Sequence, residues 1–245
     1  MYEQRFYRAW SEKRPLCRHE LKIEESDLLI LFDNETGAAA LKTAAETNLR
    51  SARTAIKKHI HETPYFAHAL SPIDISPSAP PIIRAMGDAG RAWNVGPMAA
   101  VAGAVAESVA RAICRYSETV LVENGGDIFA ISPTPVRFAL YAGETSPFRN
   151  ALTFEVSAKK GIAICTSSGR IGPSLSMGSA DAVAAIHRSG AVADAAATSI
   201  ANRIRTSADI TAVTEEEQRR KRLHALIACM DDKLGIWGDI TLIKN

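Results

Sequence analysis

Several features that mark particular classes of protein are missing from this chain of 245 residues. None of its four cysteines (Cys17, Cys114, Cys165 and Cys229) stands at metal-ligand or redox spacing from another, so we expect buried thiols in a reducing compartment. Residues 1–8 contain no apolar stretch that could act as a signal peptide, and no apolar run is long enough to span a bilayer. These absences predict a cytoplasmic protein that does not enter a membrane.

An excess of one charge is also missing. The 29 basic and 27 acidic residues give a formal net charge of +2, which provides no electrostatic reason to expect nucleic acid or an acidic membrane as partner. The sequence has no Gly-x-Ser-x-Gly, no Walker motif and no His-Glu-x-x-His. Its six histidines form no ligand cluster, since even His59 and His61 would point in different directions on a helix. The sequence therefore lacks the familiar signatures of serine hydrolases, P-loop nucleoside triphosphatases and zinc proteases.

The composition is that of an ordinary globular protein, with 47% hydrophobic and 23% charged residues. Residues 19–23 alternate polar and apolar, and 27–32 form a compact apolar run, so both predict strands. Residues 36–61 predict a helix, because apolar residues recur three and four apart along one stripe. That stripe consists of Leu41, Ala45, Leu49, Ala52 and Ile56. A second helical region over 82–115 is interrupted at 94–97.

Short β-branched or aromatic runs separated by turn residues follow, and they predict a meander of adjacent antiparallel strands. These runs cover 119–122, 128–131, 136–141, 152–156 and 162–166, with a further strand at 182–187. Helices are expected over 191–205 and 215–231, and a closing strand over 236–243. The pattern predicts an α+β fold, mainly an antiparallel sheet packed with helices, whose edge strands could support a homodimer. We expect one domain over 1–245, with a core carrying the motifs at about 71–206 and a C-terminal helix-strand extension at 207–245.

Two segments near the centre of the chain could carry chemistry. In Gly96–Glu107 a proline stands just inside a helix start, where free N–H groups and the helix dipole would favour a phosphate. The small residues of this segment equally suit close packing against another helix or the sheet. In Glu123–Asp127 the Asn-Gly pair predicts a hairpin turn, and the flanking acids could orient a hydroxyl or the water shell of a cation.

Two later segments offer oxygen and N–H groups. Cys165–Gly169 follows an apolar strand, so its hydroxyls and N–H groups could bind a phosphate or sugar, although it could equally be a simple loop. Asp194 and Thr198 stand four residues apart, which places both side chains on one helix face. Two such oxygen donors suit Mg²⁺. The alternative is that Asp194 is an acid at a helix start and Thr198 a packed side chain.

Taken in order, these four segments resemble those of the ApbE-like superfamily, whose best-known members are FAD:protein FMN transferases. The family pattern is Gly-Gly-Ile-Ala-Lys-Gly, Gly-Gly-Asp, Thr-Ser-Gly and Ala-Asp-Ala-x-x-Thr. The corresponding segments here are 96–103, 125–127, 166–169 and 193–198, all within about 94–205. Each motif is short, but their shared order and their strand–helix context make the set specific.

This resemblance implies a bound flavin nucleotide, FAD or FMN, with Mg²⁺ at its pyrophosphate. It assigns the metal to Asp194, Thr198 and a backbone carbonyl near Ala99, where the ion would neutralise the pyrophosphate. Asp127 and Asp181 are candidate general bases. The residues it places around the nucleotide are Gly96, Met98, Gly125, Gly126, Asp127, Thr166, Ser167, Ser168 and Gly169.

The chain also departs from the transferases. Their His-Ile-Ile-Asp-Pro-like segment is absent from 171–183, and Ala100 and Val101 occupy the place of the family lysine. The sequence is more similar to an uncharacterised prokaryotic branch with Gly-Pro-Met-Ala-Ala-Val-Ala-Gly, Glu-Asn-Gly-Gly-Asp and Thr-Ser-Ser-Gly. Three functions remain open: a Mg²⁺-dependent binder of a flavin nucleotide or similar pyrophosphate ligand, an FMN transferase acting on a protein threonine or serine, and a non-catalytic scaffold. An active enzyme would be a flavin-nucleotide transferase or a pyrophosphate-bond hydrolase.

Overall fold

The computed structural model describes residues 16–143, 146–148, 152–169 and 178–243. Within them the strands form one eight-stranded sheet and one three-stranded sheet, and every neighbouring pair is antiparallel. The large sheet contains, in spatial order, β1 (Cys17–Ile23), β2 (Ser26–Phe32), β3 (Val120–Asn124), β4 (Asp127–Ile131), β7 (Ile162–Ser167), β8 (Ala182–His187), β9 (Ala225–Met230) and β10 (Lys233–Gly238). The small sheet contains β11 (Thr241–Ile243), β6 (Leu152–Val156) and β5 (Val136–Leu140).

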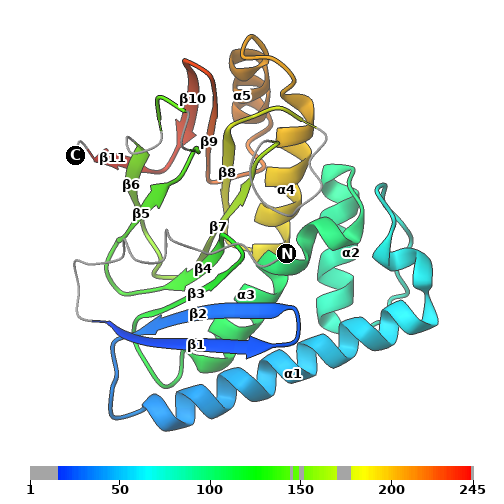
Figure 1. The fold of residues 1–245 in the computed structure, drawn as a ribbon, viewed down its shortest axis with the longest axis vertical. Helices are drawn as coiled ribbons and strands as arrows, with labels where there is room; N and C mark the ends of the chain where they lie inside the picture. The colour runs from blue at the N-terminus through cyan, green and yellow to red at the C-terminus, as the bar shows by residue number, and fades with distance from the viewer. Residues whose placement is uncertain (1–15, 144–145, 149–151, 170–177, 244–245) are drawn as a thin grey trace.

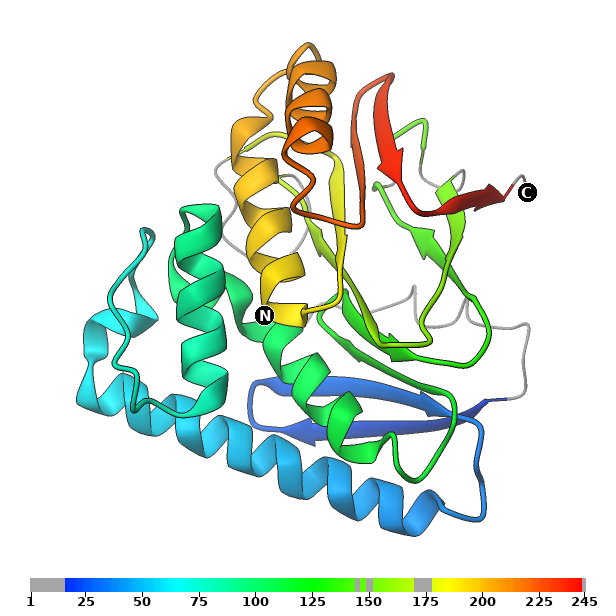
Figure 2. The ribbon, with the colours of Figure 1, turned by 180° about the vertical axis from the view of Figure 1, so that it is seen from behind.

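Helices cover one face of the large sheet (Figure 1). They are α1 (Ala38–Glu62), α2 (Pro81–Trp93), α3 (Val101–Ile113), α4 (Gly190–Arg203) and α5 (Asp209–Arg220), with short 3-10 turns η2 (Pro64–Ala67) and η3 (Pro97–Ala100). Seen from behind in Figure 2, α3 and α4 lie next to the sheet, and α1 and α2 lie outside them. The α+β prediction with a mainly antiparallel sheet is therefore confirmed. No helix in the described parts of the chain is long and apolar enough to cross a membrane.

The central strands are buried on both faces. Phe129 and Cys165 point into the core beneath the helices, whereas Ala130 and Ile164, their neighbours in sequence, point into a second core. This alternation follows from the two-residue period of a strand. The second core lies between the two sheets and is completed by residues such as Phe154 of β6. Burial on both faces explains why these strands consist almost entirely of apolar residues.

Helix α1 forms as its sequence pattern predicts. All five residues of the stripe that begins at Leu41 and ends at Ile56 are buried. The helix ends at Glu62, and Pro64 begins η2 directly afterwards. In Figure 1 the helix runs beneath β1 and β2, and its buried side packs mainly on α3.

Three expectations about the strands and helices are wrong. The helix expected over 215–231 ends at Arg220, because residues 225–230 are six consecutive buried residues that form β9 inside the large sheet. The strand expected over 236–243 is two strands, β10 and β11, which belong to different sheets; the chain turns between them after Gly238 (φ 110°), the last residue of β10. The expected meander is also interrupted. Strands β5 and β6 belong to the small sheet, so β4 pairs with β7 in the large sheet instead of with β5.

Candidate functional site

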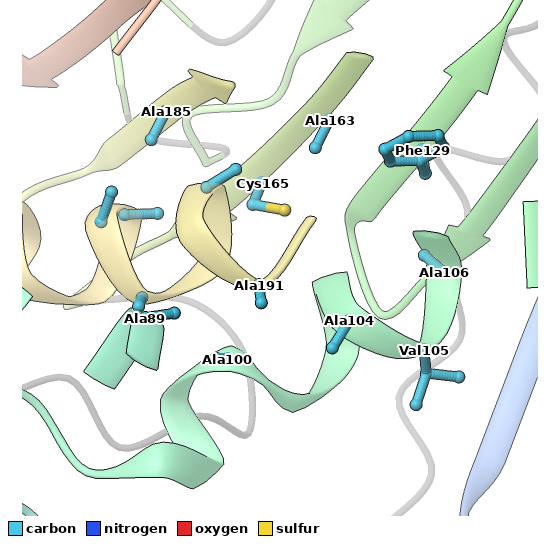
Figure 3. Packing of buried hydrophobic residues seen from close by; sticks show 14 of the residues in the cluster. Ala89, Ala100, Ala104, Val105, Ala106, Phe129, Ala163, Cys165, Ala185 and Ala191 are labelled. Carbon is cyan, nitrogen blue, oxygen red and sulfur yellow. The ribbon is translucent and has the colours of Figure 1, made fainter. Parts of the chain in front are cut away.

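Helices α3 and α4 meet at a backbone contact between two glycines. A Cβ atom on Gly103 would lie 2.3 Å from the carbonyl oxygen of Gly190, and one on Gly190 would lie 2.1 Å from that of Gly103. Since real Cβ atoms do not approach another atom this closely, only glycine fits at either position. Figure 3 shows this region, with Ala104 of α3 and Ala191 of α4 beside the crossing. The small residues of the first motif thus allow α3 to pack closely on α4, which is the alternative to a phosphate site.

An acid of each helix binds the start of the other. The Gly103 N–H donates to Asp194 Oδ2 at 2.9 Å, and the Gly190 N–H donates to Glu107 Oε2 at 2.7 Å. Negative side chains are stabilised at helix starts by the free N–H groups and the helix dipole. Asp194 is therefore an acid at a helix start, but at that of α3 rather than of its own helix. The Gly103 N–H, one of the groups considered for binding a phosphate, is therefore already bonded to this carboxylate.

Asp127 and Asp194 form a buried carboxyl pair. Asp127 begins β4, directly after Gly125 (φ 68°) and Gly126 (φ 99°), and its Oδ1 accepts the Thr166 N–H at 2.8 Å. Burial raises the pKa of Asp127 well above its ordinary value, and the carboxylate of Asp194 raises it further. Burial also raises the pKa of Asp194, against the backbone N–H of Gly103 and a hydrogen bond with Asp127. Burial and the closeness of two acids thus both disfavour the state in which the two carboxyls are ionised.

Cys165 lies beside the two carboxyls and is buried with them. Its Sγ donates to the carbonyl oxygen of Gly190 at 3.6 Å. Burial, followed by the nearby Asp127 and Asp194, raises the pKa of this thiol well above its ordinary value. A thiol in such surroundings stays protonated and is a poor nucleophile. The side chain therefore packs and does not react, as expected for a buried cysteine.

The second motif is a hairpin tied to α3. Glu123 Oε1 accepts the Gly126 N–H at 2.8 Å, so this acid stabilises the turn itself. Asn124 Nδ2 donates to the carbonyl oxygen of Ala102 at 3.2 Å, which holds the turn against the start of α3. The glycines at 125 and 126 both have positive φ, as the Asn-Gly signal predicts.

The third motif lies beside the second. The Thr166 hydroxyl donates to the carbonyl oxygen of Gly126 at 3.3 Å, and that of Ser168 donates to Ala180 at 3.4 Å. Ser167 is buried, and the Gly169 N–H donates to Ala180 at 3.0 Å. The hydroxyls of Thr166 and Ser168 thus stabilise the loop itself. Through Thr166 and Asp127, the second, third and fourth motifs come together at one place.

The predicted metal ligands lie on α4 and η3, which pack against each other. Asp194 is buried, and Thr198, one turn further along α4, is half-buried, as are Met98 and Ala99 of η3. Just before η3, the backbone of Gly96 lies against the carbonyl oxygen of Ala69. Among the described residues no group of three or more His, Cys, Asp or Glu side chains could hold a metal. A carboxylate, a hydroxyl and a carbonyl are nevertheless the hard oxygen donors that suit Mg²⁺, so these residues fit the ion.

Asp181, the other candidate base, has a role in the turn between β9 and β10. Its Oδ2 accepts the Asp231 N–H at 3.0 Å, and its own N–H donates to the carbonyl oxygen of Cys229 at 3.0 Å. Asp231 has a positive φ of 53°, which an aspartate tolerates better than most residues. Asp181 thus stabilises a tight hairpin turn.

Glu107 is the residue of this region to which sequence reasoning assigned no role. The signal was present, because Gly103 and Glu107 stand at the same spacing as Gly190 and Asp194. Only the adjacency of α3 and α4 shows that each acid reaches the other helix.

Comparison with known proteins gives consistent matches along the chain. A family model described as AbpE bacteria matches residues 8–221. The UPF0280 protein of Methanocaldococcus jannaschii is 35% identical over 243 residues, covering 96% of this chain and 94% of the relative. The UPF0280 protein of Methanospirillum hungatei is 36% identical over 228 residues, covering 92% of this chain and 89% of the relative.

Two solved structures share the fold. A mutant of the flavin transferase ApbE from Vibrio cholerae matches with a TM-score of 0.54 and 13% identity, over 91% of this chain and 97% of that one. The ApbE protein from Thermotoga maritima matches with a TM-score of 0.51 and 12% identity, over 87% of this chain and 94% of that one. At such identities the likeness concerns the fold alone.

Proposed function

The chain belongs to the family described as AbpE bacteria, within the ApbE-like superfamily, and we propose that it binds a flavin nucleotide or similar pyrophosphate ligand together with Mg²⁺. One observation carries this proposal. Asp127, Thr166 and Asp194 come from three separate motifs, and the fold brings them into direct contact. Within the described residues no ion pair joins a basic side chain to Asp127 or Asp194, and buried carboxyls in such surroundings are costly to maintain, which is why they cluster at functional sites.

The two acids of the proposed site are each oriented by a backbone N–H group. Asp194, Thr198 and the Ala99 carbonyl would hold the ion, which when bound would neutralise the charge of a pyrophosphate. The Gly103 N–H orients Asp194, and the Thr166 N–H orients Asp127. Hydrogen bonds of this kind fix the direction of a metal-binding carboxylate and strengthen binding.

FMN transfer to a protein threonine or serine is a second candidate, favoured by the fold shared with flavin transferases. It needs a substitute for the histidine segment that 171–183 lacks. A scaffold without chemistry is a third candidate, and the burial of Asp194 and its bond to Gly103 favour it. FAD fluorescence in the presence of an acceptor protein separates all three. Transfer splits FAD into FMN esterified to the acceptor hydroxyl and free AMP, which removes the adenine that quenches the flavin, so the emission brightens with time. Binding alone changes the emission once, and a scaffold leaves it unchanged.

The test is FAD binding to the purified protein with and without Mg²⁺. Asp194→Asn and Thr198→Val should abolish the Mg²⁺-dependent part of the binding, since the first replaces a charged carboxylate with a neutral amide and the second removes the hydroxyl ligand. Thr214→Val is the matched control, because Thr214 is a buried helical threonine whose hydroxyl bonds only within α5, to Ile210. If neither FAD nor FMN nor any other nucleotide binds the wild type, with or without Mg²⁺, the proposal is refuted.

A further inference from the structure

The contacts between α3 and α4 are related by an approximate twofold symmetry. In each helix a glycine precedes an acid by four residues, the glycines touch, and each acid accepts the N–H of the other glycine. Asp194 is the acid of one half and Glu107 that of the other. We infer that Glu107 is a positioning residue for Asp194: it sets the place of α4 on α3 and thereby the direction of the Asp194 carboxylate. This inference rests on the proposed function, in which Asp194 is a metal ligand.

Glu107 is itself held at both oxygens. Its Oε2 accepts the Gly190 N–H at 2.7 Å, and its Oε1 accepts Nε of Arg111 at 2.7 Å. The side chain is mostly buried, so water competes little for these bonds. A carboxylate fixed in this way anchors the first residue of α4, one helical turn before Asp194.

The anchor extends to the strand that carries Asp127. The guanidinium of Arg111 lies over the ring of Phe129, 4.9 Å from its centre. Phe129 stands two residues after Asp127 on β4, hence on the same face of the sheet. Glu107 and Arg111 therefore connect α3, α4 and β4, the three elements whose relative placement decides whether Asp127 and Asp194 meet.

Loss of the Glu107 anchor has a specific local consequence. The start of α4 would be free to move along α3, because the glycine contact fixes the separation of the helices but offers no directional bond. The Gly103 N–H···Asp194 bond, 2.9 Å in this state, would then open more often. Supporting contacts of this kind change metal affinity by about 10- to 100-fold.

The experiment compares Glu107→Ala and Glu107→Gln with the wild type. Glu46→Ala is the control, because Glu46 forms the same acid–arginine pair four residues apart, with Arg50, on the exposed side of α1. Three quantities are measured: the Mg²⁺ concentration that half-saturates FAD binding, the melting temperature, and the hydrogen exchange rate of the Gly103 amide. Glu107→Ala should raise the Mg²⁺ requirement by about tenfold or more and speed the exchange of Gly103. Glu107→Gln, which keeps one acceptor oxygen, should show a smaller effect, and Glu46→Ala none.

The outcomes separate this inference from the proposed function. If the wild type fails to bind FAD with Mg²⁺, the proposed function falls, while the exchange of Gly103 still tests the positioning. If Glu107→Ala folds and shows both the Mg²⁺ requirement and the Gly103 exchange of the wild type, the positioning role is refuted. Should Glu107→Ala not fold, the same two measurements on Glu107→Gln decide.

Discussion

The glycine contact between α3 and α4 gives a sharp prediction for Gly190→Ala. The added Cβ would lie 2.1 Å from the carbonyl oxygen of Gly103, whereas real Cβ atoms essentially never come closer than 3.0 Å. The neighbour is helix backbone, so the two helices must separate by roughly 1 Å. Overpacking of this kind costs about 1–3 kcal/mol. We expect the upper part of that range, because separation also stretches the Gly103–Asp194 and Gly190–Glu107 hydrogen bonds.

Gly87→Ala is the matched control. Its Cβ would lie at a similar distance, 2.2 Å, but from Cγ1 of Ile75, a half-buried side chain that can rotate away. Gly87 also stands inside α2, where alanine gains about 1 kcal/mol of helix propensity over glycine. The free energy of unfolding of this variant should therefore lie within about 1 kcal/mol of that of the wild type.

Chemical and thermal unfolding of the two variants test this reasoning. For a chain of this size, 1 kcal/mol shifts the melting temperature by about 2–4 °C, so a cost of about 2–3 kcal/mol should make Gly190→Ala melt roughly 4–12 °C below the wild type. Gly190→Ala should also weaken Mg²⁺-dependent FAD binding. If Gly190→Ala proves as stable as Gly87→Ala, the helices are free to separate, and the glycine contact does not fix them.

Two further predictions concern buried charges. Glu217 is fully buried and binds Arg203 and Arg222, so Glu217→Ala should lower the free energy of unfolding by about 3 kcal/mol. A denaturant titration checks this against Arg219→Ala, whose exposed side chain pairs with Glu215 on the same helix and should contribute less than about 1 kcal/mol. Burial lowers the pKa of His187 and of His224, with the His224 ring and Arg188 as the respective second causes. Because the folded pKa values lie below the unfolded value of about 6.5, this contribution to stability is complete above pH 6.5 and is lost as the pH falls through the folded pKa values. The melting temperature should fall between pH 7.5 and 5.5, and a smaller fall is expected for His187→Gln; equal falls would contradict the assignment.

The sequence predicts those parts of the fold whose signal lies within a single helix or strand, and not those that depend on how distant elements pair. The stripe of α1 is readable because five apolar residues at helical spacing leave only one face to bury. Strand β9 is not readable, since the six apolar residues from Ala225 have no period that separates a strand from a helix. The alternation in β5 and β6 shows that one face is buried, but it carries no information about which sheet that face meets.

The candidate site divides in the same way. The spacing of Asp194 and Thr198 predicts a shared helix face, because that relation is fixed by helix geometry alone. The meeting of Asp127 with Asp194 depends on how β4, α3 and α4 pack, which no local pattern records. The resemblance to the family places both acids near one ligand, and the packing of the three elements brings the two carboxyls close enough for each to affect the pKa of the other.

The two acids between α3 and α4 are equivalent in position but not in surroundings. Glu107 binds a glycine N–H with one oxygen and the guanidinium of Arg111 with the other, so the chain itself balances its charge. Asp194 binds the equivalent N–H, but it meets a second acid, Asp127. A divalent cation between Asp194, Thr198 and the η3 backbone would give this half the charge balance that Arg111 gives the other. Asp127 has a structural role of its own, since its Oδ1 accepts the Thr166 N–H, but an uncharged acceptor could make that bond without the cost of a second buried carboxyl. The second carboxyl at this place therefore supports the proposed cation site.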